Sequence, residues 1–185
     1  MTSLGSNTAK SYFYEAVTSA IGRLGISVEQ IVEFYLVEVL TKKAFAQDDL
    51  EEPLAFQLSK AREAASDLER FYLYRKAGDS ALFLLGFFSD FLERKGVHRS
   101  YVTTIGGSAY ANAAGLSPKG FNKVYYDLSD GFDEFALVLD EVKESTVMRT
   151  PQDILKLYDK WQRTKSPAAE ERLRKEGVFP LRKKT

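Results

Sequence analysis

The sequence predicts an all-α protein, and three observations lead to that prediction. Apolar residues recur every three or four positions over long segments, which is the period of a helix with one buried face. Most glycines and prolines fall between these segments. The one Asp-Gly pair, Asp130-Gly131, lacks the flanking alternation of a β-hairpin. We therefore expect a single-domain bundle of about eight or nine helices around one central apolar helix.

The first two helices are expected at residues 8–24 and 27–45. Gly25 separates them, and Ser27 starts a Ser-x-x-Gln capping-box pattern. The second segment is rich in Val and Ile, which also suits a strand, but its length and its charges favour a helix. The stripe of the first helix consists of Phe13, Ala16, Val17, Ala20, Ile21 and Leu24.

A third, long helix is expected from about residue 53 to residue 76. It follows an acidic linker at 47–53, which is the best position for a hinge. We expect Gly78 to end the helix in a left-handed conformation. Asp79 or Ser80 would then cap the next helix.

The fourth helix, at about 80–95, opens with the apolar run 81–88, "ALFLLGFF". Such a run rises only about 12 Å as a helix, far less than the roughly 30 Å hydrocarbon core of a bilayer. No membrane span is therefore expected. A helix that is apolar on nearly every face is buried, so this one is expected at the centre of the bundle. Gly86 within it either admits a crossing helix or leaves room for a ligand.

The remaining helices follow Ser-Pro and Thr-Pro pairs or glycines. Proline fits the first helical position and Ser or Thr fits the cap, so these pairs mark helix starts. The domain would span residues 1–176, and residues 177–185 would form a short basic tail. The helices are expected at about 100–114, 118–128, 131–146, 151–163 and 167–176.

Composition excludes several classes of function. Lys plus Arg equals Asp plus Glu, at 26 each, so general affinity for nucleic acid is not expected. A contact through the basic segment 167–185 is a weaker alternative. There is no cysteine, which excludes disulfides, thiolate metal sites and cysteine nucleophiles, and fits the cytoplasm. The N-terminal residues lack the pattern of a signal peptide.

The known catalytic patterns are absent. His98 is the single histidine, so zinc and di-iron patterns that need two histidines fail. We interpret it as a solvated loop residue, with an acid/base or haem-ligand role as the alternative. The segment around Asp130, Asp133 and Glu134 resembles a calcium loop but lacks carboxylates at the third and twelfth positions. Its charges are better explained as helix N-terminal charges. We expect no metal, no cofactor and no identifiable catalytic residue.

Two segments supply candidate binding residues. The segment 103–115 is rich in small residues, and Gly106 and Gly107 inside it suit either tight helix packing or the wall of a groove. Arg75 and Asp79, four residues apart, suit an ion pair at a helix joint or polar groups in a pocket. The candidates for binding a ligand or a partner are Arg75, Asp79, Gly86, Tyr101, Gly106, Gly107 and Tyr110.

Three segments together are similar to a family of uncharacterised bacterial all-helical proteins. They are "YRKAGDSALFLLGFF", "SYVTTIGGSAY" and "LYDKWQRTKSPAAEERLRKEGVFP", spread over residues 70–180. Their motifs are structural, and the resemblance implies no established activity. It implies only a bacterial, cytoplasmic protein.

These observations favour a non-enzymatic helical module for protein interaction or regulation, in a bacterial cytosol. A protein partner or self-association, such as a homodimer, is expected, because aromatic residues are abundant and catalytic patterns are missing. The alternative is a small-molecule binding protein, or an enzyme that needs little from cofactors. It would have a pocket lined by Phe and Tyr, with a small apolar ligand as a possible occupant.

Overall fold

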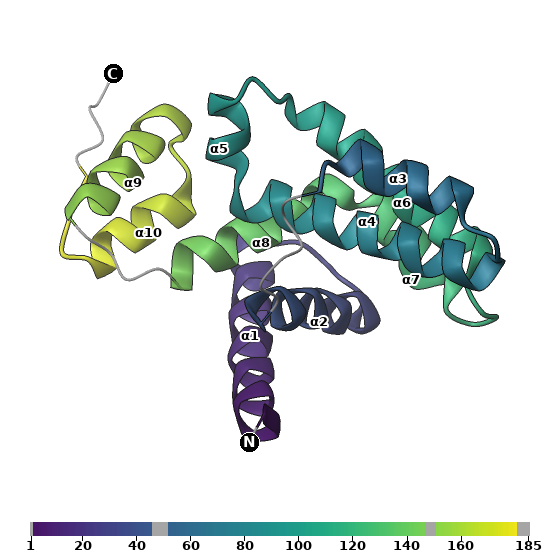
Figure 1. Ribbon diagram of the computed structural model, residues 1–185. Helices are drawn as coiled ribbons and strands as arrows, with labels where there is room; N and C mark the ends of the chain where they lie inside the picture. The colour runs from purple at the N-terminus through teal and green to yellow at the C-terminus, as the bar shows by residue number, and fades with distance from the viewer. Residues whose placement is uncertain (1, 46–51, 147–150, 181–185) are drawn as a thin grey trace. The chain divides into compact units, whose positions relative to one another are not determined.

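The computed structural model describes residues 2–45, 52–146 and 151–180 (Figure 1). All regular structure in these ranges is helical and forms ten α-helices, which confirms the predicted all-α class. Within the described ranges, no helix is both long and apolar enough to cross a bilayer. The helices are α1 (Thr2–Leu24), α2 (Gln30–Phe45), α3 (Leu54–Glu63), α4 (Asp67–Phe87), α5 (Ser89–Arg94), α6 (Arg99–Leu116), α7 (Asn122–Asp130), α8 (Phe132–Thr146), α9 (Pro151–Thr164) and α10 (Pro167–Lys175).

The chain divides into two compact units by internal packing. The first comprises residues 1–145 and the second residues 146–185. This boundary falls inside the range 1–176 that the sequence suggested as one domain. The hinge suggested at 47–53 lies largely outside the described residues.

Helix α4 is the centre of the first unit. It packs most extensively along α6, and it also contacts α3 and α2, while α6 packs on α7 (Figure 1). Ala77, Ala81 and Leu82 have no exposed surface. The predicted burial of the run 81–88 on nearly every face holds only in part. Ala81, Leu82 and Leu85 are buried, whereas Phe83, Leu84 and Phe87 are partly buried and Phe88 is 37% exposed.

The start of α4 corrects the predicted helix 53–76. Helix α3 ends at Glu63, Ala64 is extended, and Ser66 caps a new helix by accepting a hydrogen bond from the amide of Glu69 at 3.2 Å. The Glu69 carboxylate accepts a hydrogen bond from the amide of Ala65 at 3.3 Å. This reciprocal pair resembles a capping box, and its Ser-x-x-Glu spacing is present in the sequence.

The predicted stop at Gly78 is also wrong. Helix α4 continues through Gly78 to Phe87, so the run 81–88 is the end of α4 and the predicted helix 80–95 is interrupted at Phe88. Gly78 serves packing instead. A Cβ atom placed there would lie 2.7 Å from two ring carbons of Tyr110 on α6, closer than such atoms can approach.

Glycines also allow α8 to lie against α4 and α6. A Cβ atom at Gly86 would be 2.5 Å from the Cβ atom of Leu139, and one at Gly106 would be 2.1 Å from the Cζ atom of Phe132. Of the two alternatives for Gly86, a crossing helix or room for a ligand, the structure therefore favours the crossing helix. The crossing helix at Gly86 is α8. Helix α6 packs against α4 at another position, where Gly106 lies next to Ala81.

The second unit contains the helices α9 and α10, which pack against each other. Its small core consists of Leu157, Trp161, Ala169 and Leu173. Lys165, in the joint between the helices, has a positive φ of 51°, and its ammonium lies 4.2 Å from the centre of the Trp161 ring.

Candidate ligand-binding site

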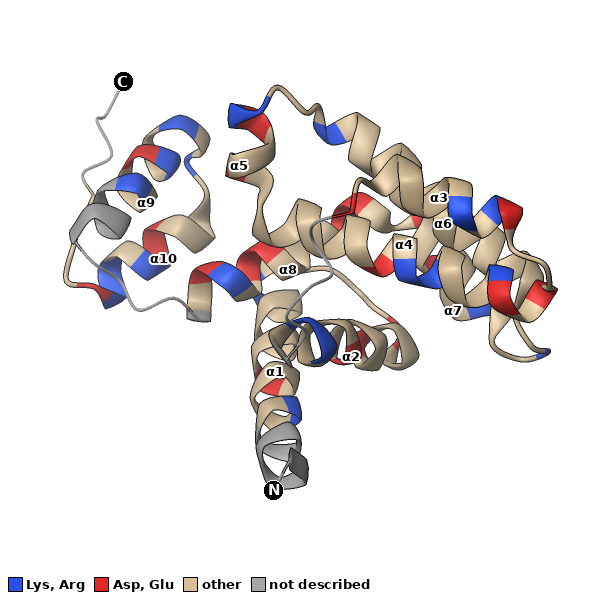
Figure 2. Cartoon of the chain, in the orientation of Figure 1, with Lys and Arg blue, Asp and Glu red and all other residues tan. Residues whose placement is uncertain are grey.

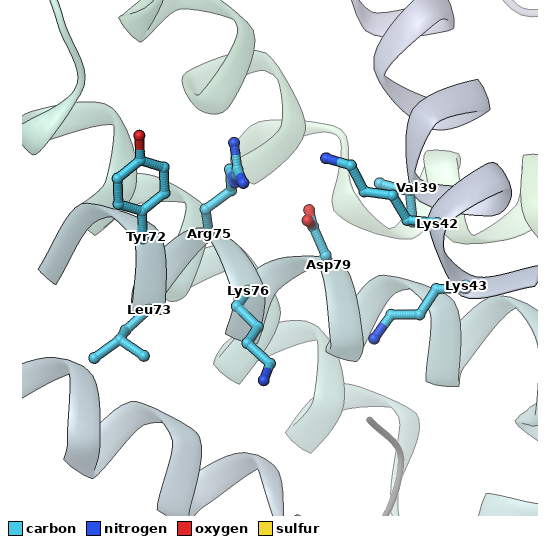
Figure 3. Close-up of a pocket in the computed structure, with 8 residues that line it drawn as sticks. All are labelled: Val39, Lys42, Lys43, Tyr72, Leu73, Arg75, Lys76 and Asp79. Carbon is cyan, nitrogen blue, oxygen red and sulfur yellow. The ribbon is translucent and has the colours of Figure 1, made fainter. Parts of the chain in front are cut away.

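A pocket of about 300 Å³ lies in the first unit, between the last turns of α2 and the middle of α4 (Figure 3). A volume of this size is at the lower end of the range for small-molecule sites. The pocket is lined by Val39, Lys42 and Lys43 of α2, and by Tyr72, Leu73, Arg75, Lys76 and Asp79 of α4.

The continuity of α4 creates this lining. Because the helix does not end at Gly78, Arg75 and Asp79 lie one turn apart on the same face. Tyr72 precedes Arg75 by three residues and belongs to that face as well. A helix break at Gly78 would have separated these side chains.

Two tyrosines hold the Asp79 carboxylate in place. The hydroxyl of Tyr35 on α2 donates a hydrogen bond to Asp79 Oδ1 at 2.6 Å, and the hydroxyl of Tyr110 on α6 donates to the same oxygen at 2.9 Å. The rings of these tyrosines pack edge to face, with centres 6.1 Å apart. Gly78 gives the Tyr110 ring the space it needs beside α4. Three helices thus meet at one carboxylate.

Burial dominates the electrostatics of this cluster. It raises the pKa of Asp79, even though the two tyrosine hydrogen bonds and the charges of Arg75 and Lys42 act in the opposite direction. Burial and the neighbouring carboxylate raise the pKa values of Tyr35 and Tyr110 well above the ordinary value for tyrosine. Both phenols therefore stay protonated and remain hydrogen-bond donors at neutral pH.

Arg75 connects the carboxylate to a third tyrosine. Burial alone would lower the pKa of Arg75, but Tyr35 and Asp79, together with a hydrogen bond to Tyr125, raise it. The guanidinium lies 5.3 Å from the ring centre of Tyr72, a distance at which a cation is attracted to the aromatic face. Arg75 is thus charged and held by its neighbours.

Four cations line the pocket against a single carboxylate. Figure 2 shows basic residues at the C-terminal end of α2 and in the middle of α4. In Figure 3 the ends of Lys42 and Arg75 lie on either side of the Asp79 carboxylate, whereas Lys43 and Lys76 point the other way. Lys43 donates a hydrogen bond to the Ser80 hydroxyl at 3.2 Å. The two cations that flank Asp79, Lys42 and Arg75, make this part of the pocket suited to an anion.

The structure brings together three of the candidates from the sequence, namely Arg75, Asp79 and Tyr110. Gly86, Gly106 and Gly107 do not line the pocket, because they lie where α8 and α7 pack against α4 and α6. Tyr101 is half-exposed on α6 and is absent from the lining.

Sequence reasoning missed the contribution of α2. Tyr35, Lys42 and Lys43 reach the cluster from a helix more than 30 residues away in sequence. Their spacing from Val39 places them on one face of α2, which was the available signal. Nothing in the sequence indicates that this face meets α4.

The other candidate chemistry lies elsewhere. His98 is exposed and immediately precedes α6. Asp133 and Glu134 lie in the first turn of α8, as expected for charges at a helix N-terminus. Across the described ranges, no three acidic, histidine or cysteine side chains are grouped in a way that suits a metal ion.

Comparisons of the chain with protein-family models, with curated proteins and with solved structures gave no match. The resemblance to bacterial all-helical proteins therefore stays a prediction. The functional proposal is therefore based on the residues that line the pocket.

Proposed function

We propose that this protein binds a small organic anion in the pocket between α2 and α4. The observation that carries the proposal is the placement of Lys42 and Arg75 on either side of the tyrosine-held Asp79 (Figure 3). The sequence offered a small-molecule binding protein as its alternative function. The present proposal keeps that function but replaces the apolar ligand with a charged one. A cytoplasmic location remains part of the proposal, on the ground of the cysteine-free sequence.

The interactions of the lining support this proposal. Lys42 and Arg75 provide two cations from two different helices, so an anion between them would contact both. Tyr35 and Tyr110 hold the Asp79 carboxylate in place before any ligand arrives. Rigid, pre-placed groups lose little entropy when a ligand binds, which favours specific recognition.

Isothermal titration calorimetry with inorganic phosphate, citrate and a set of small phosphate monoesters tests the proposal. The double variant Lys42→Gln/Arg75→Gln should weaken binding of the preferred anion by at least about tenfold, since each charged hydrogen bond contributes roughly 1.5–3 kcal/mol. The matched control is Arg94→Gln/Lys95→Gln, which removes the same two charges from exposed positions at the end of α5. Equal weakening in both double variants, or no binding of any anion at millimolar concentration, would contradict the proposal.

Binding of another protein is the second candidate function. Tyr14, Ile31 and Phe34 are large apolar residues that are 37–49% exposed, and the rings of Tyr14 and Phe34 stack between α1 and α2 with centres 5.6 Å apart. Exposed apolar residues that cluster in this way are common at protein interfaces.

Light scattering coupled to size-exclusion chromatography tests self-association through this face. If the protein forms a dimer there, Ile31→Glu/Phe34→Glu should convert it to a monomer. The control Leu137→Glu alters another exposed apolar position, on α8. A monomeric wild-type protein, or a dimer that persists in the double variant, would argue against self-association through α1 and α2.

A further inference from the structure

Toward the described part of the chain, Asp79 accepts hydrogen bonds through one of its two carboxylate oxygens. Both tyrosine hydroxyls donate to Oδ1. Among the residues that the structure describes, none donates a hydrogen bond to Oδ2. The carboxylate faces the space between Lys42 and Arg75 (Figure 3). The pocket therefore presents a hydrogen-bond acceptor as well as cations.

An acceptor that is held in a partly buried position, and that a ligand would cover, favours a ligand that supplies a donor. Buried polar groups are almost always hydrogen-bonded, and leaving one unsatisfied is unfavourable. Asp79 is partly buried, and its anchoring by Tyr35 and Tyr110 restricts its ability to turn away. A ligand that lacks a hydrogen-bond donor would shield Oδ2 from water and give it no hydrogen bond in return.

The positive charge of the pocket favours a neutral hydrogen-bond donor on the ligand over a cationic one. Lys42 and Arg75 lie on either side of the one carboxylate of the lining, and their positive charge opposes a ligand ammonium group. A neutral hydroxyl donates without adding positive charge. The same field favours a dianion such as a phosphate monoester over a singly charged carboxylate.

We propose that the ligand is a phosphorylated polyol or sugar, whose phosphate lies between Lys42 and Arg75 and whose hydroxyl donates to Asp79 Oδ2. The carbon skeleton would contact the apolar part of the lining, at Val39 and Leu73. The volume of about 300 Å³ restricts the ligand to a compact molecule. This inference rests on the proposed function, because it names the class of anion bound in the same pocket.

The experiment compares phosphate monoesters that differ only in hydroxyl groups. Calorimetry is performed on the full chain with glycerol 3-phosphate and propyl phosphate, and with ribitol 5-phosphate and pentyl phosphate as a longer pair. In at least one pair, the wild-type protein should bind the hydroxylated member about tenfold more tightly, as expected for one hydrogen bond to a charged group.

Asp79→Asn tests the assigned acceptor. The asparagine Oδ1 atom can still accept from both tyrosines, and its amide then presents a donor to the pocket. The tenfold preference should fall to about one, while the alkyl phosphate binds at least as well because a negative charge is gone. Circular dichroism verifies that the variant folds. Lys42→Gln should instead weaken both members of a pair by similar factors.

The outcomes separate the two proposals. If all four esters fail to bind at millimolar concentration, this inference is overturned. If the alkyl and hydroxylated esters bind equally and Lys42→Gln weakens both, the inference is overturned while the proposed function stands. If the preference persists in Asp79→Asn, Asp79 is not the acceptor and the inference is likewise overturned.

Discussion

Asp79 is under opposing electrostatic influences in the folded chain. Burial disfavours its charge, whereas two phenols and two neighbouring cations favour it, and the net effect is a raised pKa. Its position is nonetheless defined by three helices, because Tyr35 comes from α2 and Tyr110 from α6. The folded chain thus disfavours the charged form of Asp79 at the place where that residue organises the pocket, and shifted pKa values are common in binding sites.

The raised pKa predicts how Asp79 affects stability across pH. Between the ordinary value near 3.8 and its higher folded-state pKa, Asp79 holds more protons in the folded chain than in the unfolded chain. Its contribution to stability therefore falls as pH rises through that window, and the cost is fully present above it. Asp79→Asn keeps an acceptor for both tyrosines and removes the free-energy cost of burying a charged carboxylate.

We expect Asp79→Asn to melt at a higher temperature than the wild-type protein at pH 7. The difference should shrink as pH falls and vanish near pH 4. Differential scanning calorimetry from pH 4 to pH 8 measures both trends. Asp130→Asn, at an exposed position on α7, is the control for a change of net charge. A lower melting temperature for Asp79→Asn at pH 7 would show that attraction to Lys42 and Arg75 outweighs burial.

At the scale of the element, α4 shows how small residues decide helix packing. Gly78 and Gly86 lie in the helix interior and have side chains of other helices where a Cβ atom would be. Glycine costs about 1 kcal/mol relative to alanine at such a position. The close approach of α6 and α8 offsets that cost. The same residues therefore weaken the isolated helix and strengthen the bundle.

Two glycine variants separate these effects. Gly86→Ala should destabilise the protein by about 1–3 kcal/mol, because the new methyl group would meet the Cβ atom of Leu139 and the carbonyl oxygen of Ala136. Gly115→Ala, in α6, should stabilise it by up to about 1 kcal/mol, because nothing lies within 4 Å of the new atom.

Urea unfolding followed by circular dichroism measures both variants. The midpoints should move in opposite directions from that of the wild-type protein. If Gly86→Ala is as stable as Gly115→Ala, α8 is not packed against Gly86 as closely as the structure has it.

At the scale of the whole molecule, the two compact units have cores of very different size. The core of residues 1–145 extends through every helix from α1 to α8, whereas the described part of residues 146–185 has a core of four buried apolar side chains. A unit of about 40 residues buries little apolar surface relative to the entropy lost on folding. We therefore expect the second unit to be the less stable one.

Trp161 provides a direct test, because it is the single tryptophan and is buried in the second unit. Its fluorescence should report unfolding at a lower denaturant concentration than the circular dichroism signal, to which the many helices of the first unit contribute most. Leu173→Ala should shift the fluorescence transition and leave most of the circular dichroism transition in place. Coincident transitions in the wild-type protein and in the variant would show that the units unfold together.

Part of the fold could be predicted because local rules were sufficient. Gly25 and Gly96 end helices with φ of 68° and 70°, and Pro167 begins α10 as the Ser-Pro pair indicated. The beginning of α4 was missed although Ser66 and Glu69 carried the capping pattern. Gly78 was misread because a glycine that ends a helix and one that packs against a ring look the same in sequence.

The sequence by itself determined the all-helical class, a core position for part of the run 81–88 and a set of candidate polar residues that includes Arg75, Asp79 and Tyr110. These follow from periodicity, composition and spacing, which are local properties of the chain. The tertiary structure alone decided that Tyr35 and Lys42 of α2 face Asp79, and that α8 lies against Gly86. The physical reason is that a helix has several faces, and its partner on each is chosen by packing between segments far apart in the chain.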